Sequence, residues 1–457
     1  MPPTDSPAEP PAIIELFDGE TLGGWVTEGG RSLPAKVVVR GRQASDDPDW
    51  GDVGGGSAAK NFAYVAGAAD LFLPPGEYRV SVHHGPEYTD HVAEVSVTAG
   101  SVATVRADLQ RAIATRGWVS ADLHVHALPS FDAPTLLADR VRSLAAVDVE
   151  VAVATDHNAV TDYGPTIAAL ALEQSLTSVV GDEVTTEGVL TGHYNVFPLA
   201  PGSPALRFDN VAPSELFRAA RARSPEPLVV QVNHPRMGSI GYFDLFRFDR
   251  EDVSGWLRRA TAADVSFDAL EVFSGDHYDD VEEVERVLRD WYALLDVGHR
   301  IVATGNSDSH SIAYHEAGVP RNWVYVGVDQ PARVSQRAFV DAVRAGRVVV
   351  SSGPFIDLRV GGQMVGGTVG AGSVAVEVAV DGAPWIDLAE VEIVVRGVTR
   401  KRWTRGDGGP RRLVGRATLE LERGDWVIAI ARGARAMPHL YRSGALPFAF
   451  TNPVWVE

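Results

Sequence analysis

The chain has 457 residues, of which 45% are hydrophobic and 22% charged, a composition typical of folded proteins and a length that suits two or three domains. Its 60 acidic and 41 basic residues give a net charge of −19, which argues against a nucleic-acid partner because such partners are bound by basic surfaces. The absence of cysteine excludes disulfides, thiolate metal sites and a cysteine nucleophile. Any metal ion must therefore be bound by His, Asp or Glu, which suits Zn, Mn or Fe.

The Pro-rich residues 1–11 are predicted to be a disordered lead. They contain neither a basic segment nor a long apolar core, so we expect no secretory signal and a cytoplasmic protein. Secretion remains an alternative only if a signal peptide has been trimmed from the sequence. No apolar run approaches 18 residues, and no membrane-spanning segment is predicted.

Residues 12–114 are predicted to form an N-terminal β-sandwich. "GEYRVSVHHG" and "HVAEVSVTAG" alternate apolar and polar residues between turns rich in Gly and Pro, the pattern of half-buried strands. His83, His84 and His91 lie in these stretches and are expected at the surface.

Between residues 115 and 353 the pattern changes to short apolar strands that are followed by helical patterns. "WVSADLHVHA" precedes "PTLLADRVRSLAAV", and "VEVAVATDHN" precedes "YGPTIAALALEQ". Such alternation predicts a parallel sheet, here a β/α barrel. From residue 354 to 457 the sequence alternates again, as in "SVAVEVAV" and "DWVIAIARG", and predicts a C-terminal β-sandwich.

Imidazoles and carboxylates gather at the predicted strand ends of the central region. In a β/α barrel the carboxyl ends of the strands meet at one mouth, so residues far apart in sequence come close together there. Six of the nine histidines of this region lie at such ends. The residues concerned are His124, His126, Asp156, His157, Glu183, His193, His234, Asp308 and His310.

Each of these residues alone also has a structural interpretation. A single histidine at a strand end is more often structural than a ligand, and the His124/His126 pair alone leaves both interpretations open. Eight or nine such residues at one predicted mouth favour a metal site. His277, His299, His315 and His439 lack this context and are assigned no role.

The motifs resemble the PHP (polymerase and histidinol phosphatase) superfamily. The matching stretches, in order, are "DLHVH" followed by Asp132, "TDHN", "GDEVTT", "VNHPR" and "SDSH". "GHYN", "GVPRNWVYV", "SSGPF" and "FTNPVWV" are most similar to its carbaryl-hydrolase-like CehA/McbA branch. The resemblance implies an α/β fold with a distorted (β/α)7 barrel, here flanked by the two β-sandwiches.

The resemblance also implies two or three divalent metal ions. One would be held by His124, His126, Glu183 and Asp308, and Glu183 would bridge to a second ion held by His193 and His234. A third would be held by Asp132, His157 and His310. Members of the superfamily often have His where Asp132 stands, so the third site depends most on this residue.

The predicted function is hydrolysis of a small molecule by a hydroxide that bridges the metal ions. The bond is a phosphoester, or a carboxyl or carbamate ester or amide. Arg236 is predicted either to bind an anionic oxygen of the substrate or to pair with an acid at the barrel rim. Asp156 is predicted to orient a ligand or to transfer a proton, and Asp122 and Asn158 to support ligands. The alternative is a non-catalytic protein that binds glycans or peptides and contains structural metals.

Overall fold

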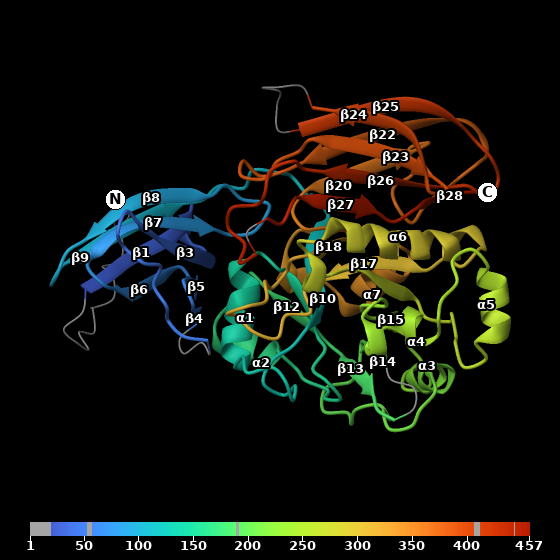
Figure 1. The fold of residues 1–457 in the computed structure, drawn as a ribbon, viewed down its shortest axis with the longest axis horizontal. Coiled ribbons are helices and arrows are strands. Elements are labelled where there is room, and N and C mark those ends of the chain that lie inside the picture. The colour runs from blue at the N-terminus through green and yellow to red at the C-terminus, as the bar shows by residue number, and fades with distance from the viewer. Residues whose placement is uncertain (1–19, 53–56, 189–191, 406–411, 443) are drawn as a thin grey trace, which may run out of the picture.

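The computed structural model describes residues 20–52, 57–188, 192–405, 412–442 and 444–457 of a mixed α/β protein with several sheets (Figure 1). The predicted lead, residues 1–11, lies outside this part of the chain. In Figure 1 the N-terminal strands (blue) lie on one side of the central region and the C-terminal strands (orange to red) lie across its top. Within the described ranges, no helix is long and apolar enough to cross a membrane.

Two sheets build the N-terminal region. Their apolar faces share one core, in which Tyr78, Val80 and Val82 alternate with more exposed neighbours, as the sequence pattern predicts. One sheet contains β1 (Glu20–Glu28), β2 (Arg31–Ser32), β6 (Ala68–Leu73) and β9 (Val102–Asp108). The other contains β3 (Ala35–Arg42), β4 (Ala58–Ala59), β5 (Phe62–Val65), β7 (Gly76–His83) and β8 (His91–Val97).

The expectation that His83 and His84 lie at the surface is wrong, since each is only 3% exposed. The His83 ring stacks on His439 of the C-terminal region, with 4.8 Å between ring centroids. His84 Nε2 lies 3.4 Å from Asp148 Oδ1 in the central region. His83 ends β7 and His84 follows it, and both are covered by contacts with other regions, which a local pattern does not reveal.

The central strands pair into two sheets. The first has the order β12 (Thr177–Val180), β11 (Val151–Ala154), β10 (Trp118–Val125), β18 (Arg321–Tyr325), β19 (Val348–Ser351). The second has the order β13 (Asp182–Thr186), β14 (Gly192–Phe197), β15 (Val229–Val232), β16 (Ala269–Ser274), β17 (Val302–Asn306). Isolated bridges between Val125 and Ser309 and between His157 and Glu183 connect them. The alternating strands and helices are as predicted, whereas this pairing does not show one closed seven-stranded barrel.

Helices cover the outside of these sheets (Figure 1). The longest is α6, whose N-cap Asp280 accepts hydrogen bonds from the backbone N–H groups of Glu282 and Glu283. Its buried face, including Val284, Leu288 and Trp291, packs into the main core. The helices are α1 (Leu137–Ala146), α2 (Gly164–Ala169), α3 (Pro213–Arg221), α4 (Tyr242–Leu245), α5 (Val253–Arg259), α6 (Val281–Asp296) and α7 (Gln336–Arg344).

The C-terminal region continues the first central sheet. β27 (Phe448–Thr451) pairs with β19, so the ladder crosses the predicted boundary at residue 354. The sheet then runs through β26 (Trp426–Arg432), β23 (Glu390–Val395) and β24 (Val398–Thr404), with β28 (Val454–Val456) and β21 (Thr368–Val369) beside it. A second sheet of β20 (Phe355–Val360), β22 (Gly372–Asp381) and β25 (Arg412–Leu421) faces it across a shared apolar core.

Candidate metal centre

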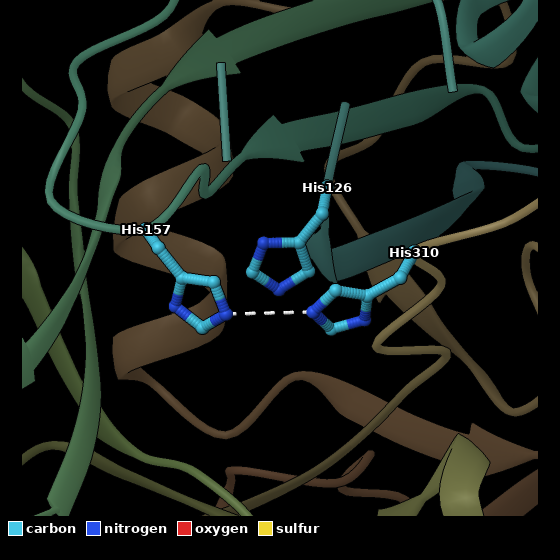
Figure 2. A group of neighbouring side chains, drawn as sticks. All are labelled: His126, His157 and His310. Carbon is cyan, nitrogen blue, oxygen red and sulfur yellow. Dashed lines mark hydrogen bonds between the residues drawn. The ribbon is translucent and has the colours of Figure 1, made fainter. Parts of the chain in front are cut away.

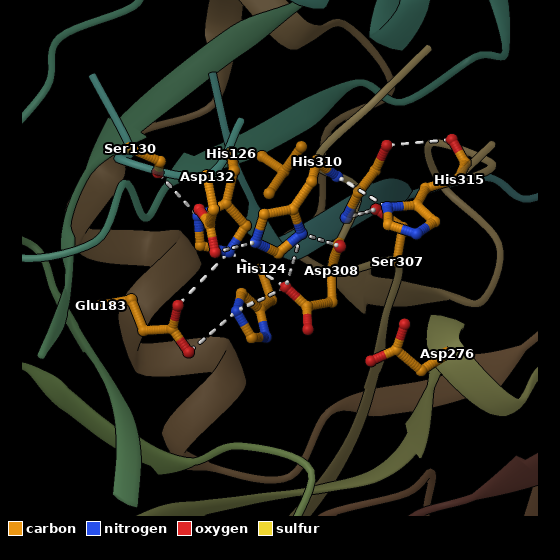
Figure 3. A network of polar contacts seen from close by, with 12 residues as sticks. His124, His126, Ser130, Asp132, Glu183, Asp276, Ser307, Asp308, His310 and His315 are labelled. Atoms are coloured by element: carbon orange, nitrogen blue, oxygen red, sulfur yellow. Dashed lines mark hydrogen bonds and ion pairs between the residues drawn. The ribbon is translucent and has the colours of Figure 1, made fainter. Parts of the chain in front are cut away.

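The two central sheets bring polar side chains from six strands to one place. His124 lies in β10 and His126 just after it, Glu183 in β13 and His193 in β14. His157 follows β11, His234 follows β15, and Asp308 and His310 follow β17. Because β10 and β11 are parallel neighbours, and β15, β16 and β17 likewise, their carboxyl ends present these residues on the same side. Figure 3 shows part of the resulting cluster, with His124, His126, Glu183, Asp308 and His310 among its labelled residues.

Glu183 is the centre of the cluster and is fully buried. Its two carboxylate oxygens face five imidazoles, so each oxygen lies near ring nitrogens from different strands. The distances are 3.1 Å to His124 Nε2, 3.2 Å to His193 Nδ1 and 3.8 Å to His234 Nε2 from Oε1, and 3.3 Å to His126 Nε2 and 2.7 Å to His157 Nδ1 from Oε2.

Asp308 is the second shared carboxylate. Its Oδ1 lies 3.1 Å from His124 Nε2 and 3.0 Å from His126 Nε2, and its Oδ2 lies 4.0 Å from His234 Nε2. Asp308 and His234 have φ angles of 49° and 24°, in the left-handed region that residues other than glycine rarely adopt. Such backbone strain is concentrated at functional sites, where the surrounding structure maintains it.

A third group lies toward the surface. His126, His157 and His310 point toward one another, and the Nε2 atoms of His157 and His310 are 3.4 Å apart (Figure 2). Asp132 Oδ2 lies 3.3 Å from His157 Nε2 and 3.5 Å from His310 Nε2, and the Asp132 side chain is 40% exposed. The cluster therefore opens to solvent at Asp132.

The donor atoms have the spacing that a metal ion requires. Three sets have ligand atoms within 4.8 Å of one another, and two of them share Glu183. Two ligands of a tetrahedral zinc ion lie about 3.4 Å apart. The sets are His124/His126/Glu183, His157/Glu183/His193 and His126/His157/His310. The first and third overlap the ligand sets that the sequence predicts, and His193 joins Glu183 as expected.

Charge also favours cations in this cluster. The three carboxylates Glu183, Asp308 and Asp132 face imidazoles that are largely neutral at pH 7 when their pKa has its ordinary value of about 6.5. Buried negative charge must be compensated by protons or by metal ions. His310 Nδ1 lies against the Asp308 carbonyl oxygen and His157 Nδ1 against the Glu183 carboxylate, so neutral rings carry their protons on Nδ1. The two Nε2 atoms that face each other then both present lone pairs, which a cation or an extra proton would compensate. The residues therefore fit divalent metal ions.

The pKa values report the same electrostatics. Burial raises the pKa of Glu183, but the neighbouring imidazoles, His124 first, outweigh it and hold this pKa well below its ordinary value. Burial lowers the pKa of His157, but Glu183 and Asp132 raise it to about 10. Burial and the neighbouring His310 lower the pKa of His126 to about 3. Protons therefore occupy part of the cluster where ions would bind, and metal binding would release them.

Three of the rings have a further partner at Nδ1, which in His157 is also the nitrogen that faces Glu183. His124 Nδ1 lies 2.8 Å from Glu271 Oε2, His126 Nδ1 lies 2.9 Å from Ser130 Oγ, and His157 Nδ1 lies 2.5 Å from Thr185 Oγ1. Such partners fix the ring orientation and the tautomer of metal-binding histidines. Ser130, in a loop, and Thr185, in β13, were not predicted, because a single hydroxyl residue has no distinctive sequence signal.

Three further residues were missed by sequence reasoning. Glu271 is an acid inside the apolar β16 and 1% exposed, which was an available signal. Asn233 precedes His234, and its Nδ2 donates to Glu183 Oε1 over 2.8 Å. His315, to which no role was assigned, accepts a 3.2 Å hydrogen bond from the His310 backbone N–H.

Asp156 lies behind the cluster. Its Oδ1 accepts hydrogen bonds from the Ala127 N–H at 2.7 Å and from Ser130 Oγ at 3.0 Å, and the side chain is fully buried. Asp122 similarly accepts from the Ser307 hydroxyl and from backbone N–H groups. Asn158 bonds to the backbone of Thr185. These contacts place all three residues among the groups that support the cluster.

Arg236 is held by acids of the protein. Its Nε donates to Asp290 Oδ2 over 2.7 Å and its Nη1 to Asp244 Oδ1 over 2.9 Å, which is the rim salt bridge that the sequence left open. Arg236 also lines a small cavity together with His234 and Glu271. The wall of this cavity contains Val272, Val284, Val287 and Met237.

Comparison with known proteins adds two weak likenesses. No family model and no curated protein matches the chain. A solved amidohydrolase from Chromobacterium violaceum, with bound sulfate and no metal, aligns with a TM-score of 0.26 and 16% identity over 42% of this chain and 87% of that one. An engineered protein aligns with a TM-score of 0.15 and 13% identity over 50% of this chain and 48% of its own, about half of its length. Neither likeness is close enough to support an argument, so the functional conclusion rests on the geometry of the cluster.

Proposed function

We propose that this chain is a metal-dependent hydrolase with a PHP-type site that acts on a small molecule. The observation that carries the proposal is the position of Glu183, which lies within 3.8 Å of five imidazole nitrogens positioned by four strands. A buried carboxylate shared in this way is suited to bridging two ions. The order of the sequence motifs supports the same class.

The proposed ligands are those that the resemblance implies, and each set shares at least two residues with one of the three clusters of donor atoms. One ion would be held by His124, His126, Glu183 and Asp308, a second by Glu183, His193 and His234, and a third by Asp132, His157 and His310. Zn, Mn or Fe suits this set of imidazole and carboxylate donors. When bound, such ions would lower the pKa of water and polarise the bond that is cut.

The protein orients the ligands and limits the access of water. Glu271 and Ser130 fix the His124 and His126 rings, both of which are fully buried. The entrance lies at Asp132, beside Phe131, which is 77% exposed and stacks on His157 with 4.9 Å between ring centroids. A substrate would therefore approach from the side of Asp132 and His310.

The arginines near the cluster favour a substrate of low charge. Arg140 is fully buried and donates to the backbone oxygens of His126 and Ser309, and Arg236 is paired with two acids. A phosphate group is usually bound by arginine, lysine or backbone N–H donors that are available to it. A carboxyl or carbamate ester or amide is therefore the preferred substrate class within the proposal, ahead of a phosphoester.

The experiment is metal analysis combined with a substrate panel. The purified chain is freed of metal, reloaded with Zn, Mn or Fe, and assayed on p-nitrophenyl phosphate, bis-p-nitrophenyl phosphate, p-nitrophenyl acetate and a p-nitrophenyl carbamate. We expect two or three ions per chain and turnover of the acetate or carbamate that depends on metal. His124→Ala and Asp308→Ala should abolish turnover and reduce metal content.

Three results would contradict parts of the proposal. Full activity in either alanine variant would refute the assigned centre. Full metal loading without turnover of any substrate would favour the non-catalytic binding protein with structural metals. Turnover of phosphate substrates alone would support the assignment as a hydrolase but would show that the bond cut is a phosphoester.

A further inference from the structure

The segment between β17 and β18 contains Asp308 and His310 and is in contact with both flanking regions. Glu316, six residues after His310, is 4% exposed. Its two carboxylate oxygens lie 2.8 and 2.6 Å from Nζ of Lys36, which belongs to β3 of the N-terminal region. The Tyr441 backbone N–H of the C-terminal region also donates to Glu316.

Lys36 is itself enclosed at this junction. Its side chain is fully buried, and Nζ also donates to the backbone oxygen of His439 over 3.3 Å. The ring of Phe62 lies 4.2 Å from the ammonium group. Burying a charged pair is costly unless its geometry and hydrogen bonds are well satisfied. An apolar pair would pack these regions together equally well, so packing alone does not explain the choice of a lysine and a glutamate.

A short chain of contacts leads from Glu316 to the metal cluster. His315, the preceding residue, accepts the hydrogen bond from the His310 N–H at 3.2 Å. The His315 backbone oxygen accepts from Ser309 Oγ at 3.0 Å, and its N–H donates to Ser311 over 3.1 Å. A displacement of Glu316 would therefore displace His315 and with it the backbone that sets the direction of the His310 ring.

We infer that Lys36 is a positioning residue of the hydrolase, which acts through Glu316 and His315 on His310. The inference rests on the proposed function and assigns a role to the flanking regions: they fix the segment that contributes Asp308 and His310. Loss of this contact should weaken the outermost ion, at Asp132, His157 and His310. The ion at His124 and Glu183 should be affected less, because those residues lie on β10 and β13.

The test compares Lys36→Met with wild type by two measurements. Chelator competition with Zn gives the dissociation constant of each ion, and hydrogen–deuterium exchange of the metal-free chain gives the protection of residues 307–319. We expect the weakest-bound ion to lose about tenfold in affinity or more, as for other groups that orient metal ligands. Exchange in residues 307–319 should become faster, with exchange in β10 unchanged.

Two further variants make the comparison specific. Lys36→Met/Glu316→Gln leaves no unpaired buried charge and serves if the single variant does not fold. His84→Asn is the matched control, because His84 also forms a buried contact between regions, with Asp148, and neither residue contacts the 307–319 segment in the described structure. We expect the double variant to show the same metal loss as Lys36→Met and the control to bind zinc as wild type does.

The outcomes separate this inference from the proposed function. Wild-type affinity for every ion in both Lys36 variants would overturn the inference and leave the hydrolase intact, even if residues 307–319 exchanged faster. A wild-type chain that takes up no metal would overturn the proposed function. Hydrogen–deuterium exchange would then still test whether Lys36 fixes the segment of residues 307–319. Unchanged protection of this segment in both Lys36 variants would show that it does not.

Discussion

Nδ1 of His124 lies 2.8 Å from Oε2 of Glu271, on the side of the ring opposite the Nε2 atom that faces Glu183 and Asp308. Glu271 also accepts a 2.9 Å hydrogen bond from Asn306 Nδ2, so its carboxylate is held from a second strand. The carboxylate fixes the His124 tautomer and makes the ring a stronger metal ligand.

Glu271→Gln should weaken metal binding while the fold is retained. Glutamine keeps the size of the side chain and an oxygen acceptor for His124 but removes the charge that favours donation of the ring to a cation. We expect about a tenfold loss of zinc affinity, and a larger loss for Glu271→Ala. Chelator competition measures the zinc affinity, and circular dichroism shows whether the fold is retained. Unchanged affinity in the alanine variant would show that His124 does not need this partner.

Asp132→Ala tests whether a third ion binds. The Asp132 side chain is 40% exposed and contacts His157 and His310, so its removal leaves the core intact. We expect the metal content to fall by one ion per chain and the melting temperature of the metal-free protein to stay the same. Inductively coupled plasma mass spectrometry of the variant and wild type gives the count. An equal number of ions in the variant and in wild type would show that no ion depends on Asp132.

The sequence predicted the members of the cluster better than their surroundings. His124 and His126 share a face because side chains two apart on a strand point the same way, and parallel strands place polar ends together. Glu271 went unnoticed because its partner His124 is 147 residues away. The burial of His83 and the pairing of β19 with β27 depend on how the regions pack. Those contacts are not encoded in any local pattern.

Arg236→Met should reduce stability and leave substrate binding unchanged. Arg236 pairs with Asp290, which is fully buried and has a second partner in Arg250 at 3.1 Å. Removing one charged partner of a buried carboxylate costs about 2 kcal/mol of unfolding free energy. Urea denaturation measures this loss, and KM for the best substrate of the panel should be unchanged. A KM that rises strongly for anionic substrates alone would instead assign Arg236 to substrate binding.

Glu87 should make the stability of the protein decrease as the pH rises from 4.5 to about 8. Burial, followed by repulsion from Asp148, raises its pKa to about 8 from an ordinary value of 4.5. Because the folded pKa lies above the unfolded one, the folded state binds more protons between these values. The stabilising contribution is complete below pH 4.5 and is lost as the pH rises through 8.

Glu87→Gln resembles the protonated carboxyl group and should remove this dependence. We expect wild type to lose more stability than the variant between pH 5 and pH 9. Urea midpoints of the two metal-free proteins at several pH values measure this difference. The histidine cluster titrates in both proteins, so its contribution cancels when they are compared. Parallel pH profiles would mean that Arg111, whose Nη2 lies 2.7 Å from the Glu87 carboxylate, keeps Glu87 ionised in the folded protein.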